Sequence, residues 1–170
     1  MGVDQIMTNQ LGKLIVYSDG GCRMQNNHKG NKVSATDKSA YAYQIGTETD
    51  ILQLDGQAMY GKTNNQMELQ GLAAALDWLV AHHYTDHEIM CVLDSKYVLD
   101  GIQSWMPNWK KNNWQTASKK PVANKQEWLK IDALVQQFSS IEYVWVKGHA
   151  ESVGNNQVDD LLNQKMDELA

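Results

Sequence analysis

Cysteine and proline are scarce in this chain, and long apolar runs are missing. The two cysteines, Cys22 and Cys91, stand at no metal-ligand or redox spacing, so neither a zinc site nor a disulfide scaffold is expected. The apolar run 72–80 is interrupted by Asp77 and falls short of the roughly 20 residues that a membrane span needs. Residues 1–13 lack the charged-then-apolar layout of a signal peptide. We therefore expect a soluble cytoplasmic protein.

The length and composition are those of one globular domain. The chain has 170 residues, of which 42% are apolar and 21% are charged, which is enough to bury a substantial core. We expect a single domain over residues 1–170, with a flexible start at 1–12 and a basic protrusion at about 105–124. We also expect a monomer.

Charge is distributed unevenly along the chain. The formal net charge is -5, yet residues 101–130 contain six lysines against one acid, Glu127, so this stretch carries +5 and the remainder -10. A basic patch on an acidic body is typical of proteins that bind phosphate groups. The stretch therefore predicts a nucleic-acid partner.

The periodicity of apolar residues predicts an α/β fold. Three β-rich runs, 13–18, 40–46 and 51–59, indicate an antiparallel meander. Leucines at helical spacing then predict a helix over 65–82. The remaining expected elements are strands at 88–93 and 141–146, and helices beginning near Tyr97, at 126–138 and around Val158 to Leu169. A meander followed by β-α-β units predicts a five-stranded mixed sheet, three antiparallel strands plus two parallel ones, covered by helices.

Four acidic residues occupy equivalent places in these elements. Asp19 and Asp94 end the first and fourth expected strands, and Glu68 and Asp159 lie in the first turn of the first and last expected helices. Ligand sites in α/β sheets form at the carboxyl ends of strands, where helix N-termini converge, so the four acids can meet there. Clustered anions raise one another's pKa values and need a positive ion among them. Oxygen-only ligation predicts Mg²⁺ or Mn²⁺ rather than zinc.

Each acid, taken alone, also has a purely structural explanation. Asp19 fits a turn in Asp-Gly-Gly, and Asp94 fits an N-cap for the helix that follows it. Glu68 stands three residues after Asn65, the spacing of a capping box, and Asp159 complements a helix dipole. It is the joint pattern that favours a metal site.

Four segments and two further residues match motifs of a known family. They are Tyr17–Gly21, Thr63–Leu69, Leu93–Val98 and Val146–Ala150, followed by Asn155 and Asp159. In this order and spacing they resemble type 1 ribonuclease H, and the resemblance runs from Leu14 to Leu169. It implies a ribonuclease H-like fold and an endonuclease that hydrolyses the RNA strand of RNA/DNA hybrids. It further implies two Mg²⁺ ions, for which Mn²⁺ can substitute, and products with 5′-phosphate and 3′-hydroxyl ends.

The resemblance also implies roles for individual residues at the catalytic site. Asp19 would bridge the two ions, and Glu68 and Asp94 would complete one side. Asp159 would hold the ion on the water side. His149, which directly follows the last expected strand, would relay protons or help product leave.

Substrate contacts follow from the same resemblance. The residues expected at sugars and base edges are Gly20, through its carbonyl, Asn64, Asn65 and Gln66. Those expected in a phosphate pocket for the DNA strand are Thr63 and Asn108. The basic stretch resembles the protrusion of bacterial members, whose expected hybrid contacts here are Trp105, Trp109, Lys110, Lys111, Lys119 and Lys120. We expect the lysines to face phosphate, and Trp105 and Trp128 to pack inward.

Two departures from the family pattern concern substrate contact. The segment 22–39 is longer than usual, polar and free of proline, so the asparagine that touches the RNA strand is either Asn26 or Asn27. Lys96 stands where a neutral amide is common and is expected to tighten phosphate contact. A separate histidine group, His82, His83 and His87, is expected to be solvated at a helix C-terminus rather than to bind metal.

Two rival functions share this fold. A non-catalytic hybrid-binding module would lack some of the four acids or His149, all of which are present. An integrase- or resolvase-like nuclease would act on DNA, but the Thr63–Glu68 motif and the lysine-rich protrusion favour a ribonuclease H.

Overall fold

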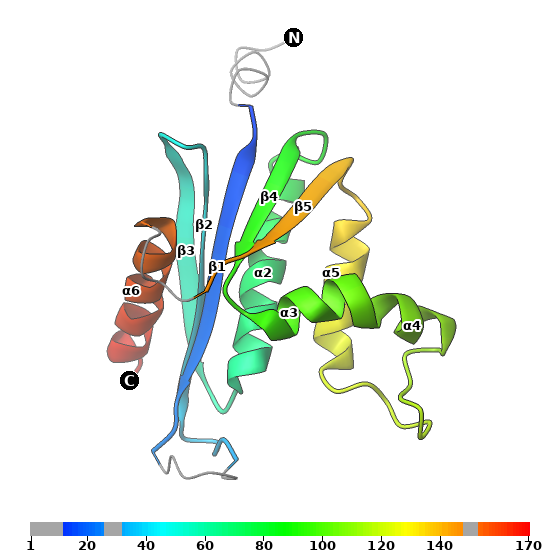
Figure 1. The fold of residues 1–170 in the computed structure, drawn as a ribbon. Coiled ribbons are helices and arrows are strands. Elements are labelled where there is room, and N and C mark those ends of the chain that lie inside the picture. The colour runs from blue at the N-terminus through cyan, green and yellow to red at the C-terminus, as the bar shows by residue number, and fades with distance from the viewer. Residues whose placement is uncertain (1–11, 26–31, 148–152) are drawn as a thin grey trace.

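The computed structural model describes residues 12–25, 32–147 and 153–170. Within these ranges lies one five-stranded sheet, made of β1 (Leu14–Arg23), β2 (Lys38–Gly46), β3 (Ile51–Tyr60), β4 (Glu88–Leu93) and β5 (Ser140–Trp145). The strand order is β3-β2-β1-β4-β5 (Figure 1). Neighbours are antiparallel from β3 to β1 and parallel from β1 to β5. The predicted meander followed by two parallel strands is confirmed.

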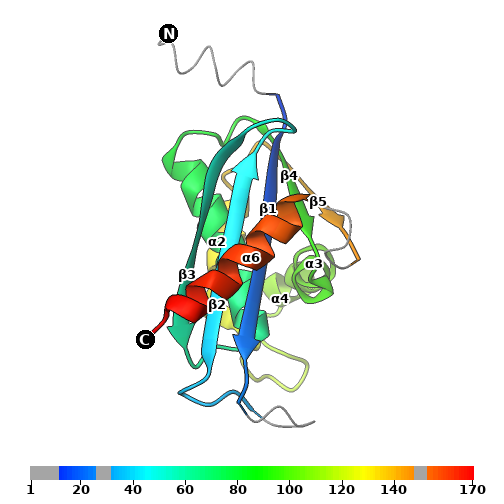
Figure 2. The same cartoon turned by 90° about the vertical axis from the view of Figure 1, so that its left-hand side faces the viewer.

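Helices cover both faces of this sheet. They are α2 (Asn64–Ala81), α3 (Lys96–Asp100), the π-helical turn η1 (Gly101–Trp105), α4 (Met106–Lys111), α5 (Lys125–Val135) and α6 (Val153–Glu168). α2, α3 and α5 lie on one face, and α6 crosses the other over β1, β2 and β3 (Figures 1 and 2). None of the helices in the described ranges is long and apolar enough to cross a membrane.

The main core forms between α2 and the sheet. The leucines whose spacing predicted the helix are all fully buried, and they are Leu69, Leu72, Leu76 and Leu79. They pack in one cluster with strand residues such as Val16, Ile45 and Ile89. A smaller cluster on the opposite face joins Ala40 and Ala42 of β2 to α6. Both faces of the sheet are therefore held by apolar packing, which fixes the positions of β1, β4 and α2, the elements that carry or precede the acids.

β1 differs from its prediction because it continues past Asp19 to Arg23. The Asp-Gly-Gly sequence is not a turn, since Gly20 and Gly21 pair with Tyr41 and Ala40 of β2. The reason for glycine is close packing. A Cβ on Gly20 would lie 2.3 Å from the backbone nitrogen of Glu68, so only glycine lets the start of α2 approach β1 this closely.

The protrusion is built on a cluster of aromatic rings. Trp128 is fully buried, as predicted, and its indole N–H donates to the Tyr97 hydroxyl (3.2 Å). The ring of Trp109 lies beside those of Trp105, Trp114 and Trp128, with centroids 5.4 to 6.0 Å apart. Trp105 is 38% exposed, so its predicted inward packing is wrong. The rings of Trp105 and Tyr97 meet edge to face. The tryptophans thus hold the basic segment against α5.

Candidate active site

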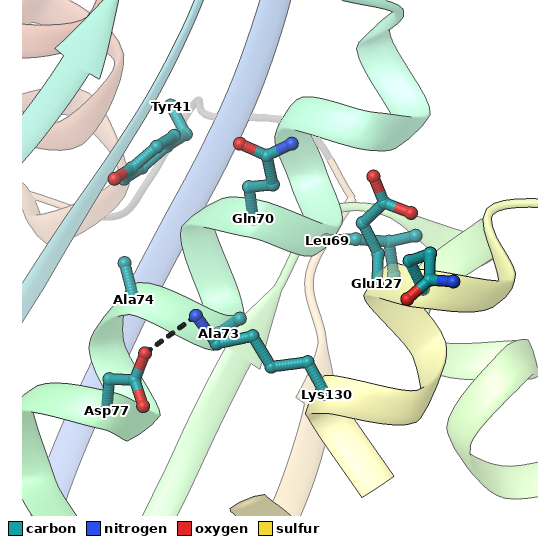
Figure 3. A pocket seen from close by; sticks show the side chains of 9 residues that line it. Tyr41, Leu69, Gln70, Ala73, Ala74, Asp77, Glu127 and Lys130 are labelled. Carbon is teal, nitrogen blue, oxygen red and sulfur yellow. Dashed lines mark ion pairs between the residues drawn. The ribbon is translucent and has the colours of Figure 1, made fainter.

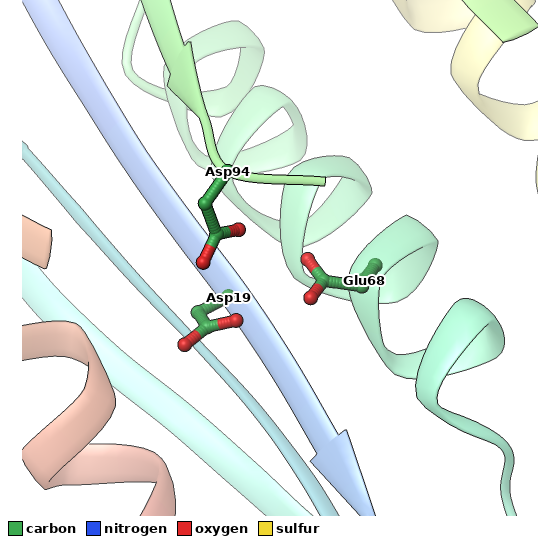
Figure 4. A group of neighbouring side chains, drawn as sticks. All are labelled: Asp19, Glu68 and Asp94. Carbon is green, nitrogen blue, oxygen red and sulfur yellow. The ribbon is translucent and has the colours of Figure 1, made fainter. Parts of the chain in front are cut away.

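Three of the four predicted carboxylates meet at one place. Asp19 comes from β1, Glu68 from α2, and Asp94 directly follows β4 (Figure 4). One carboxylate oxygen from each lies within 4.8 Å of the others. The parallel pairing of β1 with β4 ends at Tyr17 and Val92, so Asp19 and Asp94 each stand two residues beyond it. Convergence at the ends of paired parallel strands, the basis of the prediction, is what the structure shows.

The cluster is electrostatically unfavourable without a cation. Asp19 is buried, and one of its carboxylate oxygens accepts the Gly20 N–H (2.8 Å). Burial, the charges of Asp19 and Asp94, and a side-chain hydrogen bond with Asp19 raise the pKa of the Glu68 carboxyl well above its usual range. The Gly20 N–H acts in the opposite direction. The raised pKa shows that the site favours an added positive charge, whether a proton or a metal ion.

Helix capping does not account for Glu68. Thr63 is the N-cap of α2: its side chain accepts from the Gln66 N–H (3.1 Å), and the Gln66 side chain accepts from the Thr63 N–H (2.9 Å). The capping box predicted from Asn65 is therefore wrong by two residues. Glu68 is the fifth residue of α2, beyond the first turn in which it was expected.

Asp94 likewise does not cap the helix that follows it, which was the structural role considered for it. Ser95 is the N-cap of α3, and its side chain accepts the Val98 N–H (3.3 Å). Since neither Asp94 nor Glu68 caps a helix and Asp19 lies within a strand, none of the three has the structural role considered for it. Their convergence is what a metal site requires.

Asp159 stands apart from this group. It is the seventh residue of α6 rather than part of the first turn, and it is partly buried. The group of acids within 4.8 Å in the described ranges does not include it. His149 lies outside the described residues, as do Asn26, Asn27 and residues 1–11, so their expected roles stay predictions.

Some of the residues expected to contact substrate form side-chain interactions within the protein, and others are exposed to solvent. Thr63 and Gln66 form the capping box, whereas Asn64 and Asn65 are exposed at the start of α2. In the protrusion, the Lys110 ammonium forms a 2.5 Å ion pair with Asp132 of α5. The residues Asn108, Lys111, Lys119 and Lys120 are exposed, as is the Lys110 side chain beside its ion pair. Lys110 therefore ties α4 to α5, and the other lysines are open to solvent.

One neighbour of the acids was missed at the sequence level. The Trp145 indole N–H donates to the main-chain carbonyl of Asp94 (3.3 Å), and the Lys96 ammonium lies 4.9 Å from the centre of the Trp145 ring. No sequence signal marked Trp145, because an aromatic residue at a strand end is ordinary.

A hollow of about 480 Å³ lies elsewhere, between α2 and α5 (Figure 3). The Lys130–Asp77 ion pair (2.9 Å) crosses it, above a floor that includes Leu69 and Ala73. Among the described residues, no cluster of three acids lines this hollow. We therefore place the candidate active site at Asp19, Glu68 and Asp94 instead.

Comparison with known proteins agrees with this geometry. The family model for RNase H matches residues 12–167. The chain belongs to the ribonuclease H family. A ribonuclease H of Alcanivorax borkumensis is 38% identical over 159 residues, covering 94% of this chain and 95% of the relative. A ribonuclease H of Clostridium botulinum is 39% identical over 160 residues, covering 94% and 99%.

The fold is also that of solved ribonucleases H. The structure of LC11-RNase H1 in complex with RNA/DNA hybrid has a TM-score of 0.67 to this chain, with 20% identity, and covers 91% of this chain and 97% of that one. Family, relatives and fold together make this chain a ribonuclease H enzyme.

Proposed function

We propose that this ribonuclease H hydrolyses the RNA strand of RNA/DNA hybrids at the Asp19–Glu68–Asp94 cluster, with divalent metal ions as cofactors. The observation that carries the proposal is the cluster itself: three carboxylate oxygens lie within 4.8 Å, and the pKa of Glu68 is raised. Three acids this close are stable together only with a positive charge among them. Enzymes that hydrolyse phosphodiesters use such groups of acids to hold divalent metal ions.

The residues present fit Mg²⁺. All ligand atoms are carboxylate oxygens, which Mg²⁺ and Mn²⁺ prefer, and no cysteine or histidine of the described ranges joins the group. Asp19, Glu68, Asp94 and Asp159 would hold two ions, with Asp19 as the central ligand, Glu68 and Asp94 as its companions, and Asp159 as the ligand nearest the attacking water. When bound, the ions supply an activated water and neutralise charge on the scissile phosphate.

The chain's own residues do the remaining work. The buried Asp19 and the packed start of α2 hold the carboxylates in place before substrate binds, which lowers the cost of reorganising the site. His149 is proposed to relay a proton to the leaving 3′-oxygen. Water attacks phosphorus and the bond to the 3′-oxygen breaks, leaving 5′-phosphate and 3′-hydroxyl ends.

Hybrid recognition is assigned to the surface around the cluster. The Gly20 carbonyl and the exposed Asn64 and Asn65, with Gln66, would read sugars and base edges in the minor groove. Thr63 and Asn108 would receive a DNA phosphate. Lys96, at the start of α3, would supply a further contact. In the protrusion the further contacts would come from Trp105, Trp109, Lys110, Lys111, Lys119 and Lys120. Most of these act on phosphate, so sequence preference is expected to be weak.

A panel of matched duplexes tests the proposal. RNA/DNA, RNA/RNA and DNA/DNA duplexes of one sequence are incubated with the protein and Mg²⁺, with and without EDTA. The proposal expects cutting of the RNA strand of the hybrid, abolished by EDTA. Cutting of DNA/DNA would favour an integrase-like nuclease, and hybrid binding without cutting would favour a silent binding module. Labelling of the product ends checks the predicted 5′-phosphate.

A further inference from the structure

Trp145 occupies a special place at the end of β5. It pairs with Leu93 in the last step of the β4–β5 ladder, and the Val146 N–H then donates to the Leu93 carbonyl (2.9 Å). The Trp145 indole N–H adds the next bond, to the Asp94 carbonyl (3.3 Å). The Trp145 side chain thus extends the pattern of hydrogen bonds between β4 and β5 by one residue. It thereby holds the backbone of Asp94, whose carboxylate belongs to the cluster.

The side chain is nonetheless 39% exposed, which is unusual for tryptophan in a structural role. The Lys96 ammonium lies over this ring, 4.9 Å from its centre. This distance is within the range of a cation–π interaction.

Lys96 stands where helix energetics disfavour it. It is the first residue of α3, directly after the N-cap Ser95. The partial positive charge at a helix N-terminus repels a lysine there. Contact with the Trp145 ring offsets this repulsion in part and fixes the ammonium beside the loop that carries Asp94. A cation kept at an unfavourable position near a phosphate-processing site is suited to bind phosphate.

We propose that Trp145 is a positioning residue with two separable actions. Its N–H fixes Asp94 for metal binding, and its ring fixes Lys96 for contact with a phosphate of the hybrid. The inference rests on the proposed function. It predicts that the two actions can be removed one at a time.

Trp145→Phe keeps a ring face for Lys96 but removes the N–H. We expect its affinity for Mn²⁺, measured by titration calorimetry, to fall by about three- to tenfold, near the lower end of losses seen when groups that orient metal ligands are removed. The salt dependence of hybrid binding should stay as in the unaltered protein, measured in Ca²⁺ to prevent turnover.

Lys96→Met gives the converse result. Its Mn²⁺ affinity should not fall, because Asp94 keeps its hydrogen bond. The slope of log affinity for hybrid against log salt should become shallower by about 0.7 to 0.9, the loss of one phosphate contact. Trp145→Leu, which lacks both the N–H and the ring, should show both effects.

Tyr143→Phe is the control, since it removes from the same strand a hydroxyl that has no hydrogen-bond partner in the described residues. It should leave Mn²⁺ affinity and salt slope unchanged. Wild-type Mn²⁺ affinity in Trp145→Phe would overturn the first action, and an unchanged slope in Trp145→Leu or Lys96→Met would overturn the second. Absence of Mn²⁺ binding in the unaltered protein would instead refute the proposed function. Near-ultraviolet circular dichroism confirms folding, and the exposed Lys96 variant tests the second action independently.

Discussion

Neutralising Glu68 should stabilise the metal-free protein while destroying its activity. Glu68→Gln keeps the shape of the side chain and removes one charge from the cluster. In the folded protein the Glu68 pKa is raised by burial and by Asp19 and Asp94, whereas in the unfolded chain it is ordinary. Folding in the absence of metal therefore costs free energy at neutral pH, and the Gln variant avoids that cost.

The size of the effect follows from the geometry. The carboxylate oxygens lie within 4.8 Å of one another, and two unit charges at that separation repel by about 3.5 kcal/mol at an effective dielectric constant of about 20. Glu68 can escape by binding a proton, which costs about 3.7 kcal/mol at pH 7 for a carboxyl of ordinary pKa, about 4.3. The cost of protonation is an upper limit to the destabilisation, and solvent screening at this partly exposed group lowers it further. We expect a gain of about 1 to 3 kcal/mol, or about 3 to 10 °C in Tm.

Thermal unfolding in EDTA across pH measures this directly. Since the Glu68 pKa is raised in the folded state, the destabilisation is absent well below about pH 4 and grows as pH rises. The Tm difference between Glu68→Gln and the unaltered protein should therefore widen from pH 4 to pH 7. Saturating Mg²⁺ should narrow it, because the ion stabilises the cluster that has all its charges.

A matched control is Glu48→Gln, which removes an exposed carboxyl in the β2–β3 turn. Its Tm should differ little from that of the unaltered protein at any of these pH values. A Tm of folded Glu68→Gln that is equal to or below the unaltered value at pH 7 in EDTA would refute the electrostatic reasoning.

Four further changes test other parts of the structure. Gly20→Ala should destabilise by about 3 kcal/mol or more in urea unfolding, since the new Cβ meets the Glu68 backbone and not a movable side chain; a loss under 1 kcal/mol would contradict the packing. The Asp37 pKa is lowered by the N–H groups of Ser34 and Gln25, so Asp37→Asn should lower Tm at pH 6, and the gap should close as pH falls below about 4; a gap independent of pH would oppose this. Replacing the lysines 111, 119 and 120 by Gln should reduce the salt slope of hybrid binding by about two, whereas Lys110→Gln should reduce that slope by less than one and also lower Tm, because it breaks the ion pair with Asp132.

Much of the fold could be predicted from the sequence, because the spacing of apolar residues reflects which side chains are buried. Leu69, Leu72 and Leu76 are spaced as one helix face, and each is fully buried. The convergence of Asp19 and Asp94 was also accessible, since both follow strands that pair in parallel. The first inference needs only local spacing, and the second needs only the general rule that such strands pair in parallel.

The errors and omissions lie mainly where contacts between distant parts of the chain decide the structure. Asp-Gly-Gly looks local, like a turn, but Gly20 is required by the approach of α2 from 48 residues further along the chain. Lys110 belongs to a lysine run, and nothing in that run reveals that Asp132 pairs with it. The N-cap of α2 is Thr63 rather than Asn65, because the side chains of Thr63 and Gln66 form the capping box. The Trp145 contact with Asp94 joins residues 51 positions apart, beyond the reach of any local pattern.

The most direct test of the metal assignment compares Asp19→Asn with the unaltered protein on one RNA/DNA hybrid. Asp19 is the most buried member of the cluster, and the Asn side chain has its shape without its charge. Single-turnover cleavage in Mg²⁺ should slow by at least about a thousandfold, the scale of losing a preorganised electrostatic group. The hybrid Kd measured in Ca²⁺ should change less than threefold. Cleavage within tenfold of the unaltered rate by the folded variant would contradict the account.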